Sequence, residues 1–172
     1  MKNFLERNLP PGYSYKAELS TVIIAFSLVT FSSLMRFSNI FSQQRQMLFF
    51  RVGRELVLDE SAIMPDFIYI LGNNLLNHLL FGILTFIIAS AIHYAYYHAG
   101  SKSIYLMRRL PNSFERHRRS LLIPALFALT FLLTAVMLFF IYFAIYMIFT
   151  PEGALVPGQW QRIWSVLGSV FR

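Results

Sequence analysis

The stretch LLIPALFALTFLLTAVMLFFIYFAIYMIF, residues 121–149, decides the class of fold. It contains no charged side chain and exceeds the roughly 20 residues that a helix needs to cross the hydrocarbon core of a bilayer. Two earlier runs, 19–37 and 67–97, are nearly as apolar. Because a helix satisfies its backbone polar groups internally, each run predicts a transmembrane helix.

The overall composition indicates the same class. Hydrophobic residues make up 56% of the chain and charged residues only 13%, about half the usual share in soluble domains. Too few polar residues remain to cover an aqueous surface, so we expect lipid to solvate the exposed apolar side chains. The chain has no cysteine, which excludes disulfides, thiolate metal sites and cysteine nucleophiles. We expect one membrane domain spanning residues 1–172, with the lipid bilayer as its surroundings.

The remaining segments carry shorter patterns. The first apolar run starts near Leu19 without a small-x-small cleavage site after it, so we expect a retained anchor rather than a signal peptide. Residues 37–65 have apolar side chains at helical spacing, which predicts an amphipathic helical segment on the membrane surface. The tail, 151–172, shows the same spacing around Trp160 and Trp164 and predicts an amphipathic C-terminal helix.

The loop 100–120 is strongly basic and sets the predicted orientation. Its single acid is Glu115, whereas its basic residues are Lys102, Arg108, Arg109, Arg116, Arg118 and Arg119. Short loops of this kind stay in the cytoplasm, and two apolar runs precede it, so the N-terminus is also predicted to be cytoplasmic. The net charge of +7 is explained by this orientation and by anionic lipid, and no nucleic acid partner is expected.

Two helical pieces are predicted within this loop. Residues 101–110 form the first, with an apolar patch, and Pro111 ends it. Asn112 and Glu115 then match a capping box, so a second helix is expected to run straight into the third span. Glu115 and Arg119 also form a favourable i,i+4 pair. Such a loop suits either contact with a partner protein or anchoring on anionic headgroups.

The stretch YLMRRLPNS, residues 105–113, and the hairpin of spans before it resemble the permease subunits of type-2 ABC exporters. The resemblance implies an all-α membrane protein with about three transmembrane helices, a cytoplasmic coupling-type helix and the amphipathic C-terminal segment. It also implies a location in the bacterial cytoplasmic (inner) membrane. Family members usually have six spans, and this chain corresponds to the first half. The resemblance therefore implies further membrane subunits, or further copies of this chain, in the assembly.

The same resemblance implies a partner and an interface. In that family the coupling helix seats in a groove of a separate ABC-type ATPase. The positions that would face the ATPase here are Ile104, Tyr105, Met107, Arg108, Arg109, Leu110 and Pro111. ATP and Mg²⁺ are expected on the partner, because this chain has no Gly-x-x-x-x-Gly-Lys loop. No cofactor is expected in the chain itself.

Polar residues in the second apolar run, 67–97, allow further interpretations of its function. Asn73, Asn77 and His78 form a candidate pathway or a helix contact, or lie among headgroups if the span starts late. His78 and His93 are about 22 Å apart along one helix and cannot ligate one haem iron within a chain. No carboxylate pair or Ser-His-Asp set occurs in the spans, so an enzyme is not expected. A non-transporting scaffold or accessory subunit is the alternative function, and a haem-carrying anchor is the third.

Overall fold

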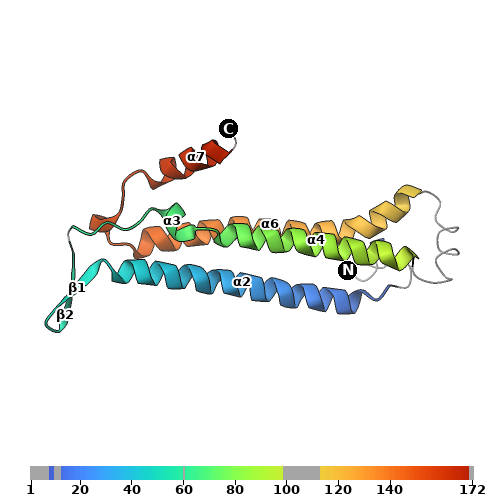
Figure 1. Ribbon diagram of the computed structural model, residues 1–172, viewed down its shortest axis with the longest axis horizontal. Helices are drawn as coiled ribbons and strands as arrows, with labels where there is room; N and C mark the ends of the chain where they lie inside the picture. The colour runs from blue at the N-terminus through green and yellow to red at the C-terminus, as the bar shows by residue number, and fades with distance from the viewer. Residues whose placement is uncertain (1–7, 10–12, 60, 99–112, 171–172) are drawn as a thin grey trace. The chain divides into compact units, whose positions relative to one another are not determined.

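The computed structural model describes residues 8–9, 13–59, 61–98 and 113–170 (Figure 1). It confirms a mostly helical chain with three long apolar helices, α2 (Tyr15–Gln46), α4 (Asn74–His98) and α6 (Ser113–Phe149). Each is long and apolar enough to cross a membrane. By length and composition, these three candidate spans indicate a multi-pass membrane protein.

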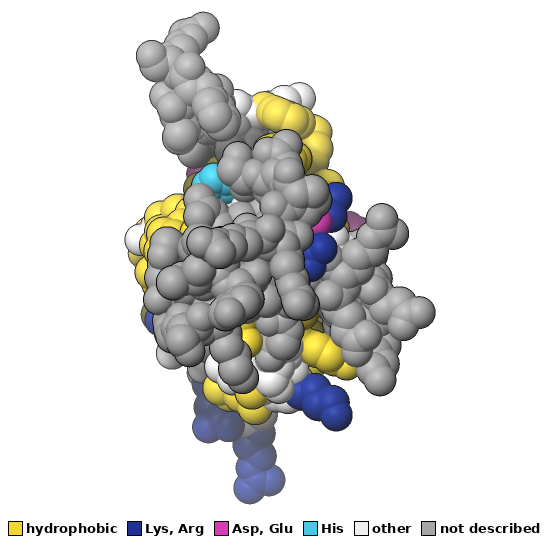
Figure 2. Space-filling model, turned by 90° about the vertical axis from the view of Figure 1, so that its right-hand side faces the viewer, with side chains coloured by type: hydrophobic (Ala, Val, Ile, Leu, Met, Phe, Trp, Pro, Cys, Tyr) yellow, Lys and Arg dark blue, Asp and Glu magenta, His cyan; other side chains and the backbone are white. Residues whose placement is uncertain are grey.

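Large apolar side chains on the long helices point outward. Leu28 on α2 is 64% exposed, and Met137 on α6 is equally exposed. Figure 2 shows hydrophobic side chains reaching the surface in several places. An aqueous environment would disfavour so much exposed apolar surface, whereas lipid tails solvate it.

The chain forms two compact units, and each long helix contributes a segment to both. Unit 1 contains residues 1–30 and 76–135, and unit 2 contains residues 31–75 and 136–172. In unit 1, Gly82 of α4 faces Phe131 of α6 so closely that an added Cβ would lie 2.8 Å from the Phe131 Cβ. A residue without a side chain is therefore required for this helix contact.

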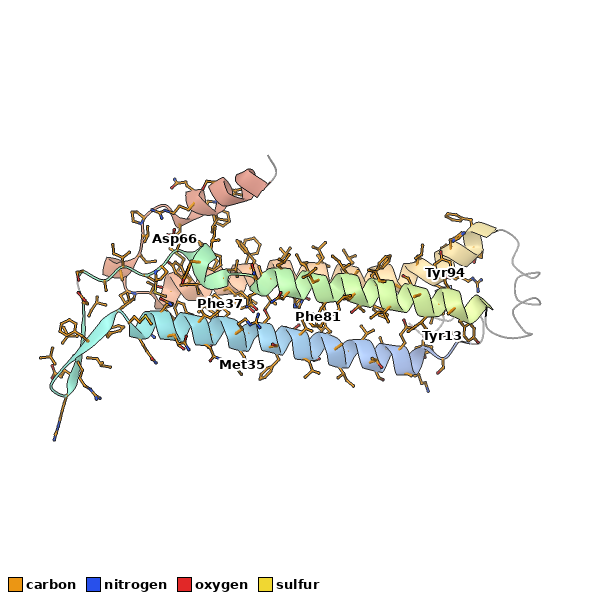
Figure 3. The ribbon with its side chains drawn as sticks, in the orientation of Figure 1. Tyr13, Met35, Phe37, Asp66, Phe81 and Tyr94 are labelled. Carbon is orange, nitrogen blue, oxygen red and sulfur yellow. The ribbon has the colours of Figure 1, made fainter. Side chains whose placement is uncertain are left out.

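Unit 2 holds the main hydrophobic core. Phe37 stacks on Tyr142 with ring centroids 4.1 Å apart, and Phe67 lies edge-on to Tyr146. Side chains of α2, α3 (Phe67–Leu71) and α6 thereby form one aromatic cluster, in which Phe37 is labelled in Figure 3. Rings packed edge to face and in parallel account for much of the buried area of such a core.

A β-hairpin replaces part of the amphipathic helix expected over residues 37–65, and that expectation is wrong. Helix α2 continues to Gln46, and strands β1 (Phe49–Val52) and β2 (Glu55–Leu58) then pair antiparallel. Gly53 adopts a φ of +64° in the two-residue turn, a conformation that glycine enters without steric cost. Two aromatic residues in β1 and a valine in each strand favour the extended backbone over a helix.

The second apolar run is interrupted near its start. Helix α3 ends at Leu71, Gly72 has a φ of +48°, and α4 begins only at Asn74. The Gly72 N–H donates to the Ile68 carbonyl and closes the last turn of α3. The continuous helix expected over 67–97 is therefore two helices, because glycine permits the left-handed backbone that terminates the first.

The two ends of the third span and the tail follow the sequence more closely. Helix α6 starts at Ser113 and runs unbroken into the third span, as expected. After the short 3-10 helix η1 (Glu152–Ala154), helix α7 (Gln159–Val170) confirms the helical tail. Gln159 accepts a hydrogen bond from the Phe67 N–H, and Arg162 binds both oxygens of Asp66. These contacts attach α7 to the start of α3.

Candidate functional site

A proline inside α6 leaves one backbone carbonyl available in unit 1. Pro124 has no N–H, so the Ser120 carbonyl four residues earlier loses its usual helical partner. The His93 Nδ1 of α4 lies 3.1 Å from this oxygen. A carbonyl oxygen only accepts, so His93 Nδ1 carries a proton and donates it. The backbone hydrogen bond that Pro124 removes from α6 thus leaves an acceptor for a side chain of α4.

The other imidazole nitrogen of His93 contacts an acid of α2. Its Nε2 lies 3.0 Å from Oε2 of Glu18. The His93 side chain is fully buried, and only 10% of the Glu18 side chain is exposed. The pair therefore joins α2, α4 and α6 within unit 1, in surroundings where an unpaired charge would be costly.

Aromatic side chains cover this pair. The Tyr13 ring lies edge-on to His93 at 5.0 Å and to Tyr96 at 5.3 Å between centroids. Burial, together with the negative charge of Glu18, raises the pKa of Tyr13 to about 12. Tyr13 is labelled in Figure 3, just before the start of α2. A neutral phenol therefore borders the acid.

The hydroxyls of Ser90 and Ser120 are buried without a hydrogen-bond partner among the described residues. Ser90 precedes His93 by one helical turn, and Ser120 supplies the carbonyl that His93 binds. Hydroxyl groups both donate and accept, and they rotate at little cost. Unit 1 therefore holds two buried hydroxyls whose hydrogen-bonding capacity is unused among the described residues.

The start of α6 presents an ordered charge cluster, defined here as Glu115, Arg118 and Arg119. Arg118 Nη2 and Arg119 Nε donate to the same Glu115 oxygen at 2.8 and 2.9 Å. The hydrogen bond from Arg119, assisted by the charges of both arginines, lowers the pKa of Glu115. The expected Glu115–Arg119 pair is thus confirmed, and this cluster follows directly on residues 99–112, which lie outside the described part of the chain.

The residues expected to face an ATPase, 104–111, lie outside the described part of the chain. The three candidate pathway residues are described but differ in their surroundings. Asn73 is exposed in the turn before α4, Asn77 is partly buried, and His78 is 1% exposed. The His78 ring centroid lies 6.3 Å from that of Phe26 and 5.3 Å from that of Phe131, and these two phenylalanine rings contact each other at 5.1 Å. His78 is therefore one member of a cluster of three rings in unit 1.

The pair of His93 and Glu18 was not predicted as a site from the sequence. His93 reads as an interfacial histidine among tyrosines, and Glu18 as the last polar residue before the first span. The sequence nevertheless contained a signal. Glu18 lies near the start of the first span and His93 near the end of the second, and two consecutive antiparallel spans bring these ends together. Pro124 inside the third run marked the available carbonyl.

Among the described residues, no group of three or more His, Asp or Glu side chains is placed to hold a metal ion. No protein-family model, curated protein or solved structure matches this chain.

Proposed function

We propose that this chain is a permease-type membrane subunit of an ATP-driven ABC exporter, coupled to a separate ATPase through its basic loop. The observation that carries the proposal is the continuity of α6, which begins at Ser113 beside the loop and continues to Phe149. A helix transmits displacement along its axis because its hydrogen-bonded turns resist compression. A partner that moves the loop would therefore move a transmembrane helix.

The charge cluster supports this mechanical role. Glu115 binds Arg118 and Arg119, so the turns nearest to the loop are held in a defined arrangement. Arg118 remains 38% exposed in its side chain, so a partner can still reach it. Ion pairs between residues one turn apart on a helix contribute little to stability, and the cluster therefore orders the helix start rather than dominating its stability.

In this proposal, the loop residues 104–111 seat on the ATPase, which binds ATP and Mg²⁺. The exposed apolar faces of the three long helices contact lipid and the further membrane chains that complete a pathway. The chain itself changes shape, and ATP hydrolysis takes place on the partner. The pathway and its cargo belong to the assembled complex.

The test is affinity purification of the chain from its own cells in mild detergent, with the co-purifying proteins identified by mass. The double variant Arg109→Glu with Leu110→Ala alters the proposed interface. The control, Arg54→Glu with Leu56→Ala, makes the same changes in the exposed β-hairpin. We expect an ATPase with a phosphate-binding loop to co-purify with the unaltered chain and the control, and to be lost from the loop variant.

Other outcomes would contradict the proposal. An ATPase retained equally by both variants would place the contact elsewhere on the chain. A chain that purifies alone, and whose loop binds anionic vesicles in a salt-sensitive way, would instead be a scaffold held by its loop charges.

A further inference from the structure

The geometry points to a proton-binding site in unit 1, formed by His93 and Glu18 and oriented by the Ser120 carbonyl. It is independent of the loop and of the proposed ATPase partner. Three observations support it: the 3.1 Å contact to the carbonyl, the 3.0 Å contact between the two side chains, and their burial.

The contacts fix the proton count of the site. Nδ1 must carry hydrogen, because the Ser120 carbonyl offers only lone pairs. Nε2 and the Glu18 oxygen are within hydrogen-bond distance, so one of them carries a proton toward the other. The pair is then either imidazolium with carboxylate or imidazole with carboxylic acid. Both forms hold the same number of protons and have no net charge.

Release of that proton changes the contact itself. The proton passes to water, the N–H···O bond is lost, and the site changes from neutral to a net charge of −1. Two lone pairs would then face each other at 3.0 Å in a buried position, so α2 and α4 separate locally. Rebinding of the proton restores the bond. Uptake of a second proton gives imidazolium with carboxylic acid and a net charge of +1.

Other titratable groups lie beside this site on each of the helices that form it. Tyr13 and Tyr96 pack at the start of α2 and the end of α4, and Tyr94 binds His117 Nδ1 at 2.7 Å. On α6 the charge cluster lies within about two turns of Ser120, and its guanidinium groups bind Glu115. His117 is a second imidazole among these neighbours, so it serves as the control in the titration below.

The first test is a titration of the full-length chain in lipid nanodiscs with ¹⁵N-labelled histidine. The His93 signals are assigned by their loss in His93→Gln. We expect a protonated Nδ1 and a hydrogen-bonded Nε2, and a titration midpoint that differs between Glu18→Gln and the unaltered chain. Glu18→Gln keeps the shape of the side chain, and His117→Gln is the matched control that leaves the His93 midpoint in place. An unchanged midpoint in Glu18→Gln would overturn the site.

The second test measures the separation of the helices. The chain has no cysteine, so spin labels attach only at cysteines that are introduced. Ala17→Cys and Ala95→Cys place one label on α2 and one on α4, both at exposed positions. We expect the distance distribution between the labels to change with pH and to become independent of pH in the His93→Gln background. A distribution that does not change with pH in the chain with His93 intact would contradict proton-linked separation.

Discussion

The Ser33 hydroxyl of α2 lies 2.8 Å from the Tyr142 hydroxyl of α6, buried within the core of unit 2. The same Ser33 residue accepts a second bond, because Asn74 Nδ2 of α4 donates to its backbone oxygen at 2.8 Å. One short residue therefore connects three helices in a part of the molecule otherwise held by aromatic packing.

We expect the bond between these two hydroxyls to stabilise the fold modestly. The single variants Ser33→Ala and Tyr142→Phe and the double variant form a cycle, and their coupling energy should be about 0.5–1.5 kcal/mol. The measurement is unfolding in mixed micelles of increasing SDS fraction. Tyr69→Phe removes a hydroxyl from a side chain that is 70% exposed and should leave stability unchanged. A coupling energy near zero would mean that only ring packing joins these helices.

The contact between Gly82 and Phe131 gives a second prediction. An alanine at position 82 would place its Cβ 2.8 Å from the Phe131 Cβ, so the helices must shift. Overpacking of this kind costs about 1–3 kcal/mol. Gly153→Ala is the matched control, because nothing lies within 4 Å of an added Cβ there. Both variants are compared by thermal unfolding in the same detergent, and equal stability would contradict close packing at Gly82.

The three long helices could be predicted because their signal is additive over many residues. Any window within residues 121–149 is apolar, and errors at single positions do not change the result. The continuation of α6 through residues 113–120 was also predictable, since Glu115 and Arg119 have the spacing of a helix pair. Their local sequence and the observed structure agree.

The hairpin and the buried pair could not be predicted in the same way. Phe41, Leu48 and Val52 have helical spacing, but Gly53 permits a tight turn that pairs the flanking residues instead. The contact of Glu18 with His93 joins residues 75 positions apart, and no local pattern specifies it. It depends on how the helices pack and on the carbonyl that Pro124 leaves available.

The phenol of Tyr13 gives a prediction on pH. Its pKa is raised from 10.0 to about 12, first by burial and then by the Glu18 charge. The folded state thus holds this proton more tightly than the unfolded state, so the associated stability is complete below pH 10 and is lost as the pH rises to about 12. In an ultraviolet titration, the tyrosine absorbance change near pH 12 should be smaller by one phenol in Tyr13→Phe than in the unaltered chain. Tyr69→Phe should leave the change near pH 12 as it is, and an equal change in Tyr13→Phe and in the unaltered chain would contradict the assignment to Tyr13.

Pro124 should determine the hydrogen bonding of His93. In Pro124→Ala the new N–H competes for the Ser120 carbonyl, because it completes the regular bond of α6. We therefore expect His93 Nδ1 to lose its acceptor, and its ¹⁵N signal to shift toward that of a solvent-bonded imidazole. Thermal stability of the helix itself should not fall, since alanine is the better helix former. Leu126→Ala, on an exposed position of the same helix, controls for general effects of substitution. If the His93 signal is identical in Pro124→Ala and in the unaltered chain, the imidazole is held by Glu18 alone, and the proline serves only to shape the helix.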